Sequence, residues 1–307
     1  MKLTTLKKCL LCKTGELKYV FSKKSYKFVK CQKCKLLFVN PRPSTELLKI
    51  IYSKEYFEGK IDLQDQEPKN FIDEKYSSIA RADKILDKVR RYKNLGNLLD
   101  IGCGLGFLLD RAIEKNWKTI GIDISDYAIK ECKKRRLSVK KGSIEEVNLP
   151  NNYFDVIIAT DVLEHIFDPI IFIKKVHKLL KIGGVLVIEV PNYEAAKAKI
   201  MGGKWPQYIP PIHLNFFTQT NIKSLLEKNC FNVVEGYSEV SLSLGVRNLL
   251  RKISKKNKFS LIENIIISLD YFITQFKKKY FYPPINFLFT KLNIKGELLA
   301  IIAIKKY

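Results

Sequence analysis

The chain has 307 residues, of which 46% are hydrophobic, and its formal net charge at pH 7 is +24. This length and apolar fraction suffice for a hydrophobic core in one large domain or two smaller ones. No apolar run reaches the roughly 20 residues of a membrane-spanning helix, and Met1 to Lys8 does not resemble a signal peptide, so we expect a cytoplasmic protein. The positive charge fits a polyanionic partner or an anionic membrane surface, and equally a surface that is simply rich in lysine.

Four cysteines form two C-x-x-C motifs separated by 18 residues near the N-terminus. They are Cys9, Cys12, Cys31 and Cys34. This spacing predicts a tetrahedral zinc site, and four thiolates leave no open position, so the metal is expected to be structural. Disulfides would need an oxidising compartment, which nothing else indicates. The segments Leu17 to Phe21 and Tyr26 to Val29 predict a hairpin between the motifs, and residues 1–42 are therefore predicted to form a zinc ribbon.

Residues 43–94 are predicted to form a mainly helical leader. The preceding F-V-N-P-R-P, Phe38 to Pro43, is expected to be extended because proline restricts its own backbone and that of its predecessor. Ser44 can cap a short helix, and Tyr76 to Tyr92 has the apolar spacing of an amphipathic helix.

The most informative segment is L-L-D-I-G-C-G-L-G, residues 98–106. An apolar run ends in Asp100, glycines follow at alternate positions, and apolar residues then recur at helical spacing, which predicts a strand, a tight turn and a helix. The helix N-terminus beyond such a turn favours an anionic group. Asp123 ends the next apolar segment about 20 residues after the loop, where an acidic side chain can hold the hydroxyls of a ribose.

Further apolar segments extend the predicted sheet. The strands are Thr119 to Ile122, Phe154 to Ala159, Val185 to Val190, Val233 to Val240 and Glu297 to Ile304, with a helix at Ile170 to Leu180 and a K-I-G-G turn before the third strand. An insertion of about residues 245–292 precedes the last strand. Its part from Val246 to Lys291 contains ten Lys or Arg against Glu263 and Asp270, and its apolar stretch predicts either a helical cover over the acceptor pocket or a peripheral contact with the inner membrane face.

These motifs, in this order, resemble class I methyltransferases that use S-adenosylmethionine (SAM). The segments that carry the resemblance are D-I-G-C-G-L-G, G-I-D-I-S, F-D-V-I-I-A-T-D-V-L-E-H and L-L-K-I-G-G-V-L-V-I-E-V-P-N. A nicotinamide dehydrogenase is disfavoured because the third glycine of its G-x-G-x-x-G pattern is missing. The resemblance implies an α/β fold with a Rossmann-like seven-stranded sheet over residues 95–307, preceded by the ribbon and by a leader that covers the SAM pocket.

The resemblance also implies which residues bind SAM. They are Asp100, Gly102, Cys103, Gly104, Gly106, Asp123, Ile124, Ser143, Ile144 and Asp161. The loop glycines would meet the methionine part, Asp123 the ribose and Ile124 the adenine. Ser143 stands where the family usually has aspartate. Asp161 follows the fourth strand, at the position where family members close the methionine pocket.

A closer resemblance is to bacterial and archaeal methyltransferases of polysaccharide and sugar biosynthesis, which combine a zinc ribbon with F-V-N-P-R-P and a P-x-H-L-x-F-F segment. It implies a sugar, nucleotide-sugar or lipid-linked glycan as the acceptor, His213 as the candidate base and His165 as a weaker one. Sugar C-methyltransferases carry Tyr-Glu-His where this chain has Pro211, Ile212 and His213, so O-methylation fits better. The alternatives are an RNA methyltransferase that uses the basic ribbon and a quinone or lipid methyltransferase at the membrane surface.

Overall fold

The computed structural model describes residues 3–43, 51–58, 60, 75–239 and 295–307. The predicted insertion of about 245–292 and the helix predicted after Ser44 lie outside these residues. Among the helices of the described ranges, none combines the length and the hydrophobicity that crossing a bilayer requires.

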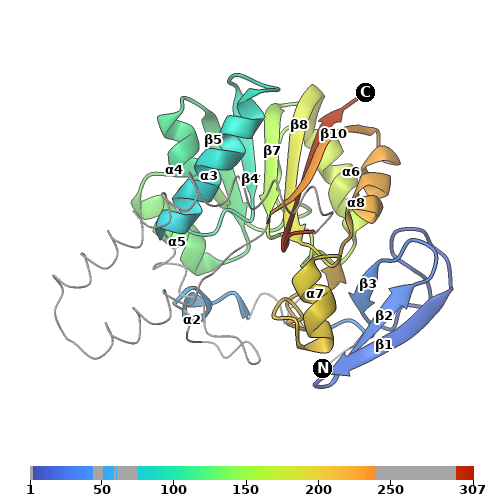
Figure 1. The fold of residues 1–307 in the computed structure, drawn as a ribbon. Coiled ribbons are helices and arrows are strands. Elements are labelled where there is room, and N and C mark those ends of the chain that lie inside the picture. The colour runs from blue at the N-terminus through green and yellow to red at the C-terminus, as the bar shows by residue number, and fades with distance from the viewer. Residues whose placement is uncertain (1–2, 44–50, 59, 61–74, 240–294) are drawn as a thin grey trace.

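A seven-stranded sheet forms the centre of the described chain, in the order β10-β11-β8-β7-β4-β5-β6 (Figure 1). Its strands are β4 (Asn97–Ile101), β5 (Lys118–Asp123), β6 (Val139–Lys141), β7 (Phe154–Thr160), β8 (Leu180–Pro191), β10 (Phe231–Glu239) and β11 (Leu298–Lys305). Neighbours pair in parallel except at β11, which is antiparallel to both β8 and β10. This mostly parallel α/β sheet confirms the predicted Rossmann-like class.

Helices cover both faces of the sheet, which explains why the central strands read as unbroken apolar runs. They are α3 (Lys75–Arg90), α4 (Phe107–Glu114), α5 (Asp126–Lys134), α6 (Pro169–Leu179) and α8 (Gln219–Glu227). Alternate residues of one strand enter different cores: Leu98 packs with residues of α3 and α4, whereas Leu99 packs with residues of α6 and α8. The side-chain period of two along a strand is therefore visible in the two apolar clusters.

The K-I-G-G segment differs from its prediction as a simple turn. The structure includes it in β8, which starts at Leu180, but the register with β7 jumps from Phe154↔Leu180 to Val156↔Val185. Gly183 has a φ of 69°, a conformation that glycine adopts without strain. The segment is thus an irregular part of the strand that bulges away from its partner.

A second sheet of four strands contains the ribbon, in the order β1-β2-β3-β9. The strands β1 (Leu17–Lys23) and β2 (Tyr26–Cys31) form the predicted hairpin, and β3 (Leu37–Val39) follows it. The fourth strand, β9 (Asn215–Phe216), comes from the distant segment around His213 and pairs with β3. The ribbon lies beside α7 (Ala196–Met201), below the large sheet in the view of Figure 1, and is joined to the rest of the protein through this shared strand.

Candidate active site

The glycine loop after β4 turns back against the end of β5. Gly102, Gly104 and Gly106 have φ values of 69°, 48° and 74°, all in the left-handed region that favours glycine. The backbone N–H of Gly102 donates to the carbonyl of Ile122 at 2.8 Å. Gly106 is the residue that precedes the first turn of α4, so the loop delivers the chain directly to a helix N-terminus.

Substitution of Gly106 by alanine should destabilise the protein by about 1–3 kcal/mol, because it combines a strained backbone with overpacking. A Cβ atom there would lie 2.7 Å from Leu137 Cδ1 and 2.8 Å from Cys132 Sγ. Gly183→Ala is the control, because Gly183 has a φ of 69°, close to that of Gly106, but a Cβ atom there would have open space around it. Urea unfolding of both variants would separate the packing cost from the strain. Equal losses of stability would contradict the packing explanation.

Asp123, at the end of β5, forms a hydrogen bond to the glycine loop. Its carboxylate accepts the backbone N–H of Gly104 and that of Ser125, both at 2.8 Å. Burial raises the pKa of Asp123, and these N–H donors act in the opposite direction. Asp100, at the end of the buried run in β4, has a pKa well above its usual value because of burial and the nearby charge of Asp123.

These residues fit SAM by the chemistry of their groups. The N–H groups of Gly102, Gly104 and Gly106 already donate within the protein, so the part of the loop that favours a carboxylate is the N-terminus of α4. The carboxylate oxygens of Asp123 each have a second lone pair that can accept from a hydroxyl. Phe57 of α2 (Lys54–Phe57) lies against the loop, 3.8 Å from the position of a Cβ atom on Gly104, and its ring is 5.7 Å from that of Tyr127. Apolar surface for an aromatic base is therefore next to the polar loop.

The remaining predicted SAM residues lie at neighbouring strand ends. Ser143 follows β6, and its hydroxyl accepts the N–H of Glu146 at 3.3 Å, so it also caps a local turn. Ile144 is buried and Ile124 is half-buried. Cys103 is buried beside Cys132. Asp161 follows β7 with a φ of 55° and pairs with Arg81 of α3, which also donates to Glu189 at 2.7 Å. Sequence reasoning missed Arg81, because an arginine on an amphipathic helix has no distinguishing pattern.

The two candidate bases, His165 and His213, lie next to each other. The rings of His165 and His213 are 4.8 Å apart between centroids and inclined at 65°. His165 lies in the turn after β7, and His213 lies just before β9. Tyr52 links His165 to the segment that follows β5. Its hydroxyl is 3.0 Å from His165 Nδ1, and its carbonyl accepts the hydroxyl of Ser125 at 2.8 Å. Burial lowers the pKa of His165 and raises that of Tyr52.

A buried glutamate completes the group. Glu164 precedes His165, and its Oε1 is 3.8 Å from His165 Nε2. The resemblance to sugar C-methyltransferases places Ile212 where those enzymes have the glutamate before the histidine, but the fold brings Glu164 close to His213 from another loop. A glutamate next to the histidine of D-V-L-E-H was visible in the sequence, whereas its proximity to His213 was not.

Arg42 joins the loops that carry these side chains. It is fully buried, and its guanidinium donates to the carbonyl of Phe167 at 2.8 Å and to the side-chain oxygen of Asn215. Asn215 in turn donates to the carbonyl of Ile166 at 2.8 Å, and the carbonyl of Glu164 accepts the N–H groups of Leu214 and Asn215. Burial lowers the pKa of Arg42 to about 9.

The four ribbon cysteines lie together as predicted. Sulfur separations are 3.4 Å for Cys9 and Cys34 and 3.5 Å for Cys12 and Cys31. Zn–S bonds of about 2.3 Å in a tetrahedron place sulfurs about 3.8 Å apart, so a small expansion would fit the ion. The hydrogen bond that Cys9 and Cys34 share lowers the pKa of Cys9 and raises that of Cys34, so this pair stabilises one thiolate. The cluster is compatible with structural zinc.

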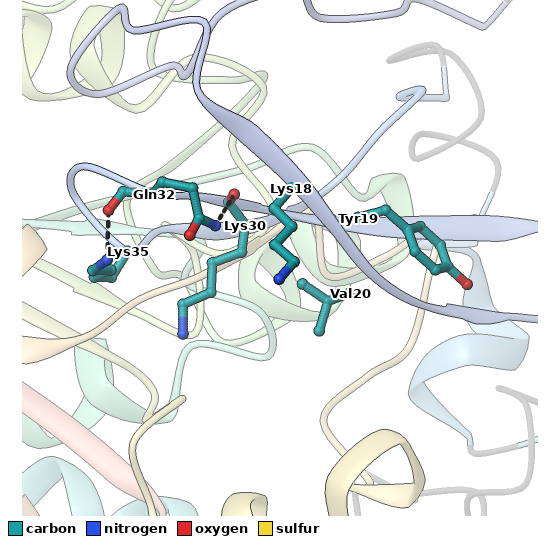
Figure 2. A pocket seen from close by; sticks show the side chains of 6 residues that line it. All are labelled: Lys18, Tyr19, Val20, Lys30, Gln32 and Lys35. Carbon is teal, nitrogen blue, oxygen red and sulfur yellow. Dashed lines mark hydrogen bonds between the residues drawn. The ribbon is translucent and has the colours of Figure 1, made fainter.

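An open basic hollow of about 420 Å³ lies on the ribbon (Figure 2). Three lysines contribute to it, together with the side chains of Tyr19 and Val20. It is lined by Lys18, Tyr19, Val20, Lys30, Gln32 and Lys35. Two hydrogen bonds order its edge, from Lys35 Nζ to the carbonyl of Gln32 and from Gln32 Nε2 to the carbonyl of Lys30. The hollow contains none of the histidines and offers positive charge to an anion.

Similar solved structures share the fold. A SAM-dependent methyltransferase from Archaeoglobus fulgidus superposes with a TM-score of 0.51 at 24% identity, covering 76% of this chain and 98% of that one. The magnesium protoporphyrin IX methyltransferase of Synechocystis PCC 6803, solved with bound S-adenosylhomocysteine, superposes with a TM-score of 0.54 at 13% identity, covering 86% of this chain and 100% of that one.

Sequence relatives point in the same direction. The ubiquinone biosynthesis O-methyltransferase of Bradyrhizobium diazoefficiens is 31% identical over 140 residues, covering 42% of this chain and 55% of that protein. The enzyme of the same name from Pelagibacter ubique is 28% identical over 195 residues, covering 57% and 81%. The chain thus spans about half the length of the first of these relatives. The sequence profile of the family described as "Methyltransferase domain" matches residues 74–236, more than half of the chain. With its Rossmann-like sheet and glycine loop, the protein belongs to this family of methyltransferase domains.

Proposed function

We propose that the protein transfers the methyl group of SAM to a hydroxyl of a sugar, a nucleotide-sugar or a lipid-linked glycan. The observation that carries the proposal is the cluster of His165, His213 and Glu164, which Tyr52 links to Ser125 of the segment after β5. A sugar hydroxyl is a weak nucleophile that needs help to lose its proton, and a polar cluster next to the methyl donor supplies that help. The resemblance in the ribbon, the F-V-N-P-R-P segment and the His213 segment supports a sugar as the acceptor.

SAM supplies an activated methyl group on a sulfonium when it is bound. The loop from Gly102 to Gly106 would hold its methionine part, Asp123 its ribose, and Ile124 and Ile144 its adenine, with Phe57 beside them. Arg81 keeps Asp161 in a fixed position at the same edge of the sheet. The chain's contribution is thereby to orient the acceptor oxygen and to remove its proton, while the S–CH3 bond breaks as the O–CH3 bond forms.

Methyl-labelled SAM, incubated with the purified protein and a cell extract separated into nucleotide-sugar, lipid and RNA fractions, tests the proposal. Label is expected in the nucleotide-sugar fraction, or in a lipid fraction whose label is released with the glycan on mild acid hydrolysis. Label that stays with a quinone or other lipid after hydrolysis would contradict the glycan acceptor and favour a quinone-type substrate instead.

RNA is a second candidate acceptor, favoured by the basic hollow of the ribbon. Three of its six lining residues are lysines, and phosphates bind to such surfaces in a salt-dependent manner. If RNA were the substrate, the triple variant Lys18→Ala, Lys30→Ala, Lys35→Ala would lose RNA binding and the slope of affinity against salt concentration would fall. Unchanged labelling of the sugar fraction by this variant supports the glycan reading.

We further propose that residues 1–42, 43–94 and 95–307 act as ribbon, leader and methyltransferase domain, with structural zinc held by the four ribbon cysteines. The basic insertion of residues 246–291 is proposed to meet a lipid-linked acceptor at a membrane surface. Flotation with anionic liposomes, with and without this insertion, measures that contact directly.

A further inference from the structure

Glu164 has a buried carboxylate without a compensating partner. The residue is 1% exposed, and neither side-chain oxygen has a hydrogen-bond partner among the described residues. Burying a carboxylate without a donor or a cation is unfavourable by several kcal/mol. The carboxylate of Glu164 therefore needs a cation or a hydrogen-bond donor beside it, or it must bind a proton.

The imidazoles of His165 and His213 lie close to the carboxylate of Glu164. One atom each of Glu164, His165 and His213 lies within 4.8 Å of the other two, and His165 Nε2 is 3.8 Å from Glu164 Oε1. The three residues come from two loops that the backbone ties together, because the carbonyl of Glu164 accepts the N–H groups of Leu214 and Asn215. The relative position of the three side chains is consequently fixed by backbone hydrogen bonds between the two loops.

The orientation of both rings is set by backbone carbonyls. His165 Nδ1 is 2.9 Å from the carbonyl of Ile212, and His213 Nδ1 is 2.8 Å from the carbonyl of Gln207. A carbonyl can only accept, so each Nδ1 carries a proton, and in the neutral form of the ring the lone pair is on Nε2. Metal-binding histidines show this arrangement, in which a carbonyl or carboxylate receives the other ring N–H and fixes the tautomer.

We propose that Glu164, His165 and His213 bind a divalent first-row transition ion, of the Zn²⁺ or Mn²⁺ type. Two imidazoles and one carboxylate are ligands that such ions accept. Bonds of about 2.0–2.2 Å require the three ligand atoms to approach one another by roughly 1 Å from their present separations, which side-chain rotation supplies. Three protein ligands leave a coordination position open, and the side chain of His165 remains 15% exposed.

The site gives the proposed reaction a specific means of activation. An oxygen bound to the open position of such an ion becomes more acidic, so an acceptor hydroxyl would release its proton to water near neutral pH. His213 would then act as a metal ligand and not as the proton acceptor predicted from the sequence. This use of the ion rests on the proposed function, whereas binding of the ion does not.

Metal counting on the full chain tests the site, with the ribbon as internal reference. The protein is equilibrated with Zn²⁺, freed of excess metal by gel filtration and analysed by mass spectrometry. Two equivalents are expected for the wild type, and one for Glu164→Gln and for His213→Ala, which lose only the second ion. His177→Gln is the matched control and should keep two, because His177 lies on α6, where it packs against the ring of Phe231.

Circular dichroism and SAM affinity confirm that each variant is folded. One equivalent in the wild type, as expected if Glu164 is simply protonated, or two equivalents in Glu164→Gln, would overturn the site. The same experiment with Mn²⁺ gives an independent readout, because the thiolates of the ribbon disfavour this ion. If the protein binds one equivalent of Zn²⁺ and methylates the sugar, the second metal site is wrong and the proposed function stands. If it binds two equivalents of Zn²⁺ but does not methylate the sugar, the metal site stands and the proposed function is wrong.

Discussion

Replacing Asp123 with alanine is expected to weaken SAM binding by about 100-fold or more. The carboxylate holds the glycine loop through the N–H groups of Gly104 and Ser125, both at 2.8 Å. Each hydrogen bond to a charged group contributes about 1.5–3 kcal/mol, and the expected contacts with the ribose are lost at the same time. Isothermal titration calorimetry with SAM measures the change in affinity.

Asp126→Ala is the control for this variant. Asp126 is only three residues away, but its side chain is 82% exposed and pairs with Lys141 on the surface. Its removal should leave the SAM affinity unchanged. An affinity of Asp123→Ala within threefold of the wild type would show that the glycine loop holds its shape, and binds SAM, without this carboxylate.

Replacing Arg42 with leucine should lower the free energy of unfolding by about 3 kcal/mol and reduce methyl transfer while SAM affinity stays the same. The substitution leaves the carbonyl of Phe167 and the side chain of Asn215 without their buried donor. These groups lie in the segments that carry His165 and His213, so the relative position of the two rings should relax. Urea unfolding, turnover and SAM titration measure the three quantities separately.

Arg42→Lys and Arg91→Leu make the Arg42 result interpretable. Lysine keeps the charge but lacks the fork that reaches two acceptors, so Arg42→Lys should recover only part of the stability. The side chain of Arg91 is 57% exposed in its ion pair with Glu235, and its loss should cost less than about 0.5 kcal/mol. A reduced SAM affinity in Arg42→Leu, with turnover per bound SAM unchanged, would contradict a positioning role for Arg42.

The sheet and the glycine loop could be predicted because their signals are local. Buried parallel strands read as apolar runs, and Asp100, Gly104 and Asp123 occur at spacings that a strand, turn and helix impose. Predicted strand limits agree with β5, β7, β10 and β11 to within a few residues. The K-I-G-G segment differs from the predicted turn because its four residues form a bulge between two paired parts of β8. A glycine-rich sequence pattern does not distinguish such a bulge from a turn before a strand.

The candidate site was only partly predictable, because its geometry depends on contacts between distant segments. Glu164 and His213 are 49 positions apart, and neither sequence neighbourhood indicates the other. Arg42 stands in a proline-rich linker where an exposed arginine would look the same, and its burial is decided by Asn215. The two-residue strand β9 is too short for any periodic pattern to reveal.

The pairing of β3 with β9 has a consequence for how the chain acquires its structure. Leu37 pairs with Phe216, about 180 positions later, so the hairpin is synthesised long before its fourth strand exists. Until then the apolar edge of β3, which is fully buried in the finished protein, offers unpaired backbone groups to other strands. Closing so long a loop is entropically unfavourable and slow, so the ribbon edge should be the last part of this surface to become protected from hydrogen exchange during refolding.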